Sequence, residues 1–88
     1  MDYILNKNGM QILVETEVME LKKQLAEQYK GIRVGKKISQ EEAAEAAGMA
    51  RPDVSRFESG RYNPSLELMI RYAQALGCDL KINLVPRD

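Results

Sequence analysis

The sequence contains no histidine, and Cys78 is its single cysteine. The lack of histidine excludes Ser-His and Cys-His nucleophile pairs and removes the commonest transition-metal ligand. A lone cysteine excludes an internal disulfide and, without histidine, a zinc site of nitrogen and sulfur ligands. Carboxylate catalysis is the enzymatic class that these absences leave, and 88 residues offer little room for a substrate pocket. We therefore expect no catalytic residue, no metal and no cofactor.

The chain also lacks net charge and any long hydrophobic run. Its 13 basic and 13 acidic side chains cancel, which argues weakly against binding to a phosphate backbone. However, residues 30–61 carry seven basic and five acidic side chains, whereas residues 1–29 carry three and five. No apolar run approaches the roughly 18 residues that span a bilayer, and the N-terminus does not resemble a signal peptide. We expect a single domain in the cytoplasm, with no membrane partner.

Residues 1–15 are predicted to form an N-terminal β-hairpin. Two segments with apolar side chains flank Asn8-Gly9, the preferred pair for a two-residue type I′ turn. That turn places Tyr3, Leu5, Ile12 and Val14 on one face. The alternative is a frayed tail with a chance Asn-Gly pair, because a lone two-stranded hairpin is marginal in water.

Residues 16–78 are predicted to be helical. A first helix begins near Glu17 with Thr16 as its cap, and ends between residues 30 and 36. Ser39 and Glu42 form a capping box for a second helix that Gly48 ends. Pro52 suits the first turn of a third helix, and Ser65 caps a fourth that ends at Gly77. The alternation of Leu80, Ile82 and Leu84 then predicts a short C-terminal strand within residues 79–88.

Two short helices joined by a glycine turn, with a third placed to cross the second, are typical of a helix-turn-helix protein. The chain resembles the Xre family of phage repressors (Cro/C1 type), whose fold is a mainly α, lambda-repressor-like bundle of four to five helices. The resemblance covers about half of the chain, and Ala43 departs from it, since the family usually has leucine there. It is carried by Arg33, residues 39–44, 47–49, 54–60 and 64–66, and residues 73–77.

This resemblance implies particular roles for individual residues. Arg33 is implied to pair with Glu58 as a structural ion pair. The N-terminus of the second helix, Ser39 and Gln40, is implied to contact a DNA phosphate, as are Arg61 and Tyr62 in the loop after the third helix. The bases are then read from the exposed positions of the third helix, which are Arg51, Pro52, Asp53, Ser55 and Arg56.

Two of these assignments have open alternatives. Each exposed arginine taken alone is better explained as a solvated charge, and it is their shared helical face that favours DNA contact. Asp53 either accepts a hydrogen bond from cytosine N4 or caps its own helix.

The end of the chain is similar to antitoxins of the HipB/HigA class, in which such a strand pairs with its copy in a partner subunit. This similarity implies a homodimer joined through Leu80, Ile82 and Leu84, bound to a palindromic operator in double-stranded DNA. Three functions follow: an autoregulating repressor that is the antitoxin of a cognate toxin, a stand-alone regulator, and a protein-interaction module that has lost DNA binding.

Overall fold

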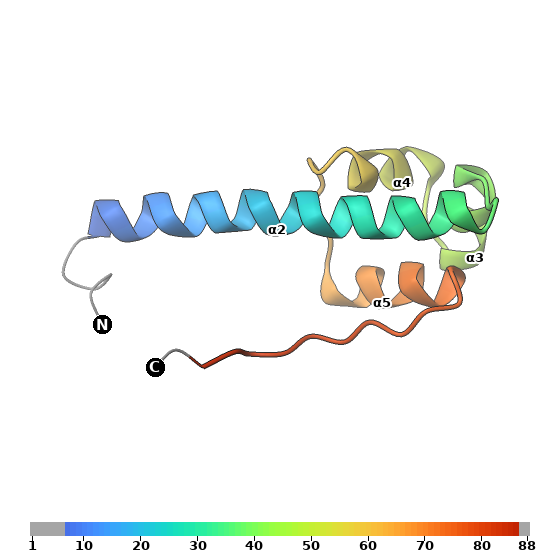
Figure 1. Ribbon diagram of the computed structural model, residues 1–88. Coiled ribbons are helices and arrows are strands. Elements are labelled where there is room, and N and C mark those ends of the chain that lie inside the picture. Colours follow the sequence, from blue (N-terminus) through green and yellow to red (C-terminus); the bar gives the residue numbers. More distant parts are fainter. Residues whose placement is uncertain (1–6, 87–88) are drawn as a thin grey trace.

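The computed structural model describes residues 7–86, with side chains from residue 13 onward. Over these residues α-helix is the only regular secondary structure (Figure 1). A long helix is followed by three short helices that pack against its C-terminal half, and the chain then runs back alongside the long helix. The helices are α2 (Lys7–Gly35), α3 (Gln40–Ala47), α4 (Arg51–Glu58) and α5 (Leu66–Ala75).

The ends of the short helices follow the capping residues in the sequence. Ser39 Oγ accepts a hydrogen bond from the Glu42 amide while the Glu42 side chain accepts one from the Ser39 amide, so the predicted capping box is confirmed. Gly48 ends α3 with a φ of 68°, a left-handed conformation that glycine adopts at little cost. Ser65 caps α5 by accepting from the Leu68 amide. The left-handed conformation of Gly48 thus ends α3, and α4 begins three residues later at Arg51.

The core lies where the three short helices meet the inner half of α2. Val54 and Ala43 are completely buried there, as is Tyr72. The rings of Tyr29 and Phe57 lie 4.7 Å apart and those of Phe57 and Tyr72 lie 5.2 Å apart, distances typical of favourable aromatic pairs. These aromatic side chains supply the bulk of the core around the small Ala43.

The predicted N-terminal hairpin is wrong. Residues 1–6 lie outside the described part of the chain, but from Lys7 onward the backbone is helical, so Thr16 lies within α2 instead of capping it. Val14, Val18, Leu21 and Leu25 recur at spacings of four, three and four residues, which places them on one side of a helix. A helix that already exists extends at little cost, whereas an isolated hairpin has no third strand to stabilise it.

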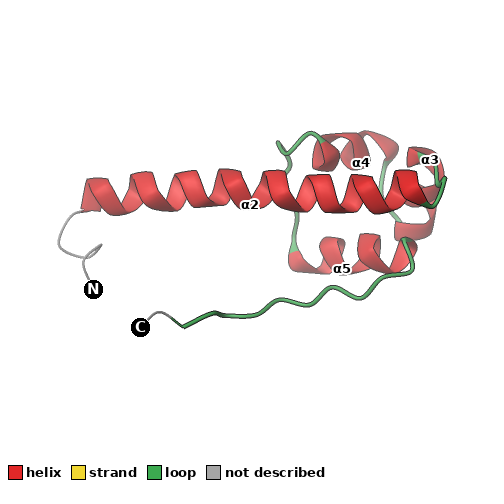
Figure 2. Ribbon diagram, viewed as in Figure 1, coloured by secondary structure: helices red, strands yellow, loops and turns green. Residues whose placement is uncertain are grey.

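The predicted C-terminal strand is also wrong. Residues 78–86, which we call the tail, form an extended segment next to α2, and Figure 2 shows no strand anywhere in the described chain. Leu80 is half-buried against the core, but Ile82 and Leu84 are exposed. The alternating pattern predicts an extended backbone correctly, but a strand also needs a neighbouring strand to complete its hydrogen bonds, and residues 7–77 offer none.

None of the helices in residues 7–86 combines the length and the apolar character needed to cross a membrane.

Candidate nucleic-acid interface

Helix α4 has two faces of opposite character. Val54 and Phe57 point into the core, with exposed fractions of 0% and 4%. On the outer face Arg51, Ser55 and Arg56 are exposed, as is Pro52 in the first turn. The structure therefore brings four of the five predicted base-reading residues to one exposed helical surface, and the fifth, Asp53, is half-buried beside them.

Asp53 and Arg56 interact with each other on this face. Arg56 Nη1 donates to Asp53 Oδ1 at 3.2 Å, one turn along the helix. The N-cap residue of α4 is Ala50, which has no side-chain hydrogen bond to offer. Asp53 thus holds the Arg56 side chain against the helix surface. An exposed pair of this kind is worth little in stability, so Arg56 can leave it at low cost.

The C-terminal end of α4 is fixed to α2 by Arg33 and Glu58. Arg33 Nε donates to Glu58 Oε2 at 2.6 Å and Arg33 Nη2 donates to Glu58 Oε1 at 2.9 Å, while Arg33 Nη1 donates to the Ile38 carbonyl. The two side chains are only 10% and 4% exposed. This two-pronged geometry fixes direction as well as distance, so it sets the orientation of α4 relative to α2.

Glu58 also accepts hydrogen bonds from two further helices. Tyr72 Oη of α5 donates to Oε2 at 2.6 Å, and Gln40 Nε2 of α3 donates to Oε1 at 3.2 Å. Burial alone would raise the pKa of Glu58, but the hydrogen bonds from Arg33, Tyr72 and Gln40 outweigh it and hold this pKa below its usual value. Burial and the neighbouring carboxylate raise the pKa of Tyr72. One carboxylate therefore connects all four helices of residues 7–86.

The predicted phosphate-contacting residues differ in their availability. Arg61 is exposed in the loop after α4. Tyr62 is half-buried, with its ring 6.4 Å from that of Phe57. Ser39 uses its hydroxyl as the cap of α3, and the Gln40 amide nitrogen is engaged by Glu58. At the start of α3 the backbone N–H groups are thus better placed for an anion than the Gln40 side-chain amide.

Sequence reasoning missed two basic residues that terminate helices. Arg71 donates to the carbonyls of Ala47 and Gly48 at the end of α3, and Lys36 Nζ donates to the Leu76 carbonyl just after α5. Cations at helix C-termini are favoured by the helix dipole. The partners lie 23 to 40 residues away in sequence, so no local pattern indicated them. Both residues are structural and reduce the number of basic groups available to a partner.

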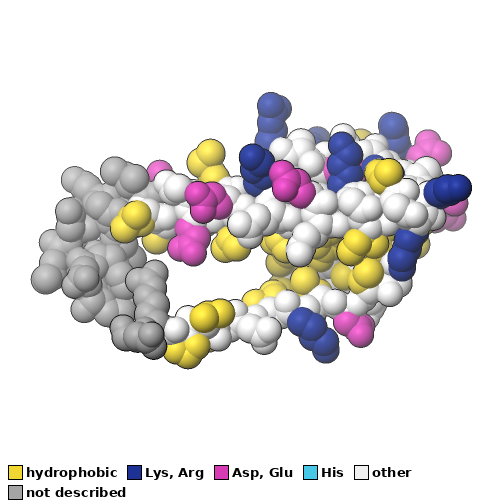
Figure 3. Space-filling view, viewed as in Figure 1, with side chains coloured by type: hydrophobic (Ala, Val, Ile, Leu, Met, Phe, Trp, Pro, Cys, Tyr) yellow, Lys and Arg dark blue, Asp and Glu magenta, His cyan; other side chains and the backbone are white. Residues whose placement is uncertain are grey.

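Basic side chains are concentrated at one end of the molecule. Most Lys and Arg side chains visible in Figure 3 lie over the end that holds α3, α4 and α5. Among the described residues, no group of His, Cys, Asp and Glu side chains is arranged to hold a metal ion. The surface that α4 and the following loop present is thus a cationic one without a metal centre in the described part of the chain.

Comparison with known proteins places these helices in a family. Residues 30–82 match the model of a helix-turn-helix family, which covers more than half of the chain. The matched region begins in the last turns of α2 and includes α3, α4 and α5. It therefore contains the Arg33–Glu58 pair and the exposed face of α4.

Two curated relatives share this region. An uncharacterized HTH-type transcriptional regulator of Methanothermobacter thermautotrophicus is 50% identical over 40 residues, which is 46% of this chain and 58% of that protein. The ImmF control region 10 kDa protein of Bacillus phage phi105 is 38% identical over 60 residues, covering 68% of this chain and 67% of the phage protein. From the family match and these relatives, the chain belongs to the Cro/C1-type helix-turn-helix family.

Proposed function

We propose that this chain is a DNA-binding transcriptional regulator that inserts α4 into the major groove. The observation that carries the proposal is the exposed face of α4, with Arg51 and Arg56 on a helix that is fixed by the core on one side and by Glu58 at its end. An arginine held on a rigid helix can bind guanine O6 and N7 with both ends of its guanidinium group. The name of the archaeal relative, a transcriptional regulator, supports this role.

Different residues on this surface would make different contributions. Arg51, Ser55 and Arg56 would contact base edges, together with Pro52 and Asp53. Arg61 and Tyr62 would contact the backbone, as would the start of α3 at Ser39 and Gln40. Base contacts give sequence preference, whereas phosphate contacts give affinity that falls as salt rises. These two contributions can be separated by experiment.

The test is fluorescence anisotropy of the full chain with duplex DNA from its own upstream region and with a scrambled duplex, at several salt concentrations. Arg56→Lys keeps the charge but loses the two-pronged geometry, so we expect the preference for the upstream duplex to fall about tenfold or more with little change on the scrambled one. Arg61→Ala should weaken binding to both duplexes equally and make the affinity depend less on salt concentration. Lys81→Ala, a charge removed from the tail, is the control and should change neither.

Each outcome has a definite meaning. If Arg56→Lys weakens binding to both duplexes equally, Arg56 does not read a base. Absence of binding to either duplex at low salt would contradict the proposal and favour the alternative of a protein-interaction module, for which the zero net charge of the chain is the supporting observation.

We further propose that the regulator acts as a homodimer on a palindromic operator, because a single short α4 reads few base pairs. We do not propose a toxin partner. The similarity to antitoxins was based on a C-terminal strand, and residues 79–86 do not form one. A repressor without a toxin partner is therefore the simpler form of the proposal, and a small toxin-like reading frame beside the gene would favour the antitoxin form instead.

A further inference from the structure

The outer half of α2 carries apolar side chains that this chain leaves uncovered. We call residues 13–21 the arm. Leu13, Val14, Val18, Met19 and Leu21 are all exposed, with values from 41% to 71%. In Figure 1 this half of α2 projects beyond the short helices. Val14, Val18 and Leu21 share one side of the helix, and apolar side chains grouped on a projecting element mark an interaction site more often than scattered ones do.

The arm continues a stripe that is covered further along the same helix. Tyr29 is buried in the core and Leu25 is half-buried against it. Leu21, Val18 and Val14 follow on the same side of α2, at the spacing of three and four residues that one helix presents to another. The inner part of this stripe, Tyr29 and Leu25, packs against the core of the same chain. The outer part, Leu21, Val18 and Val14, is exposed among the described residues.

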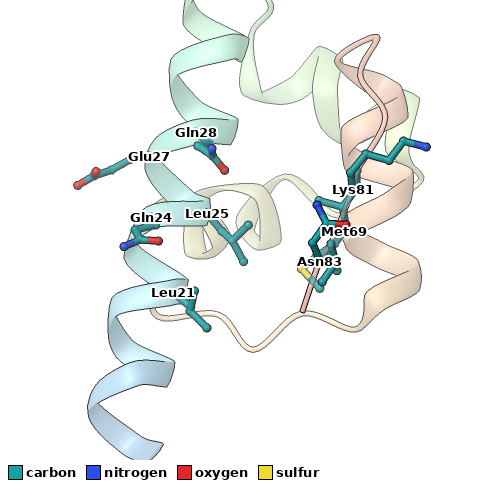
Figure 4. A pocket seen from close by; sticks show the side chains of 10 residues that line it. Leu21, Gln24, Leu25, Glu27, Gln28, Met69, Lys81 and Asn83 are labelled. Carbon is teal, nitrogen blue, oxygen red and sulfur yellow. The ribbon is translucent and has the colours of Figure 1, made fainter. Parts of the chain in front are cut away.

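A groove of about 740 Å³ lies beside this stripe, between α2 and the tail. It is lined by Leu21 and Leu25 of α2, by Met69 of α5 and by Leu80 and Ile82 of the tail. Figure 4 shows Leu21 and Leu25 pointing into this space while Glu27 points away from it. Figure 3 shows the opening between arm and tail, with hydrophobic side chains along both edges. No residue of α4 lines the groove.

The charge distribution of α2 indicates what fills the groove. Residues 13–21 contain three glutamates and no basic residue, whereas residues 22–30 contain three lysines and one glutamate. If two copies of α2 pack antiparallel about a point between Val18 and Leu21, the outer part of each arm, with Glu17, lies beside Lys22 and Lys23 of the other copy. A parallel arrangement would instead place acidic beside acidic, which is unfavourable.

We infer that the groove is occupied by the arm of a second copy of this chain, in an antiparallel pair of α2 helices centred between Val18 and Leu21. Val18 of one copy then packs against Leu21 of the other, and Val14 packs against Leu25. Because the contact is twofold, each copy gives its arm and receives one, so both grooves are filled by the same interaction. The inference specifies the surface of the dimer in the proposed function, and it leaves α4 of both copies free for DNA.

Sedimentation equilibrium of the full chain without DNA tests the surface. We expect a dimer whose dissociation constant rises by more than about 100-fold in Val18→Glu, because each copy then buries an uncompensated charge. The matched control is Thr16→Glu, which adds the same charge on the opposite side of the arm and should leave the dissociation constant within about threefold. Thermal melts of both variants check that the domain remains folded.

Disulfide cross-linking tests the direction of packing. In a Cys78→Ser background, Val18→Cys should cross-link readily, since the two copies of residue 18 lie near the centre of the pair. Val14→Cys should not, because the antiparallel arrangement separates its two copies by about 11 residues, or roughly 16 Å along the helix. Equal cross-linking at both positions would indicate a parallel pair and overturn the inference.

The remaining outcomes separate this inference from the proposed function. A monomer at the highest soluble concentration, or a dimer that Val18→Glu does not weaken, would overturn the inference even if the protein binds its upstream DNA. A dimer that behaves as expected but binds no DNA would support the inference and contradict the proposed function.

Discussion

The two halves of α2 have the same backbone conformation but very different surroundings. The inner half packs against three helices, and its Tyr29 and Arg33 are buried with their polar atoms hydrogen-bonded. The outer half, the arm, exposes its apolar side chains. This difference separates two tasks that one helix performs: the inner half contributes to the stability of the domain, and the arm offers a surface for association. Substitutions in the two halves should therefore affect different measurements.

The largest contrast is expected between a core aromatic residue and an arm residue. Phe57→Ala removes a ring that is 4% exposed and contacts those of Tyr29 and Tyr72. We expect it to lower the free energy of unfolding by about 3–5 kcal/mol. Met19→Ala, at a position 71% exposed, should change it by less than about 0.5 kcal/mol at concentrations where the protein is monomeric. Urea denaturation of both variants measures this. Equal losses would show that the arm contributes to the stability of the monomer.

The next effect concerns the buried ion pair at the end of the inner half. Arg33→Ala leaves the Glu58 carboxylate buried with only two of its partners, so we expect a loss of about 3 kcal/mol. Arg56→Ala breaks a pair whose side chains are 65% and 31% exposed and should cost at most about 1 kcal/mol. Thermal melts compare the two. Similar losses would mean that the Arg33–Glu58 pair contributes no more than a surface pair.

Acidic pH should weaken the same connection without a mutation. The pKa of Glu58 is lower in the folded chain than its ordinary value of about 4.3. Its contribution to stability is therefore complete above that value and is lost as the pH falls through the lower, folded pKa. The free energy of unfolding of Glu58→Gln should differ most from that of the wild type near neutral pH, and this difference should shrink below about pH 4. Urea titrations at several pH values measure it, and a pH-independent difference would contradict the assignment.

The smallest predicted effect is at the start of α3. Ser39→Ala removes the hydroxyl that accepts from the Glu42 amide, and we expect a loss of about 1 kcal/mol. Ser39→Asp keeps a cap and serves as the control, with a loss of no more than a few tenths of a kcal/mol. A loss in Ser39→Asp as large as that in Ser39→Ala would show that the hydroxyl acts otherwise than as a cap.

The sequence predicted those parts of the fold that are determined by neighbouring residues. Ser39, Gly48 and Ser65 act locally, so the limits of α3 and the start of α5 could be predicted from them. The exposed face of α4 was implied by the family resemblance, and Val54 and Phe57 are buried on the opposite face. These features need no knowledge of distant residues.

The errors occurred where distant contacts or competing local signals decide. Asn8-Gly9 favours a turn, but the helix that carries the apolar spacing from Val14 to Leu25 continues back through Asn8-Gly9 to Lys7. That spacing was the signal that could have corrected the prediction. The contacts of Glu58 with Gln40 and Tyr72, and of Arg71 with the end of α3, join residues 14 to 24 positions apart and had no local signal.

The unbroken length of α2 has a consequence for recognition. This helix runs without interruption from the arm to Arg33, which is bonded to the end of α4. Because α2 connects the arm to α4 without a break, a partner that binds the arm also fixes the position of α4. Each residue inserted between arm and Arg33 would advance α4 by about 1.5 Å and rotate it by about 100° about the axis of α2. The number of residues in α2 between the arm and Arg33 would thus determine the distance between the two DNA sites that two copies of α4 read.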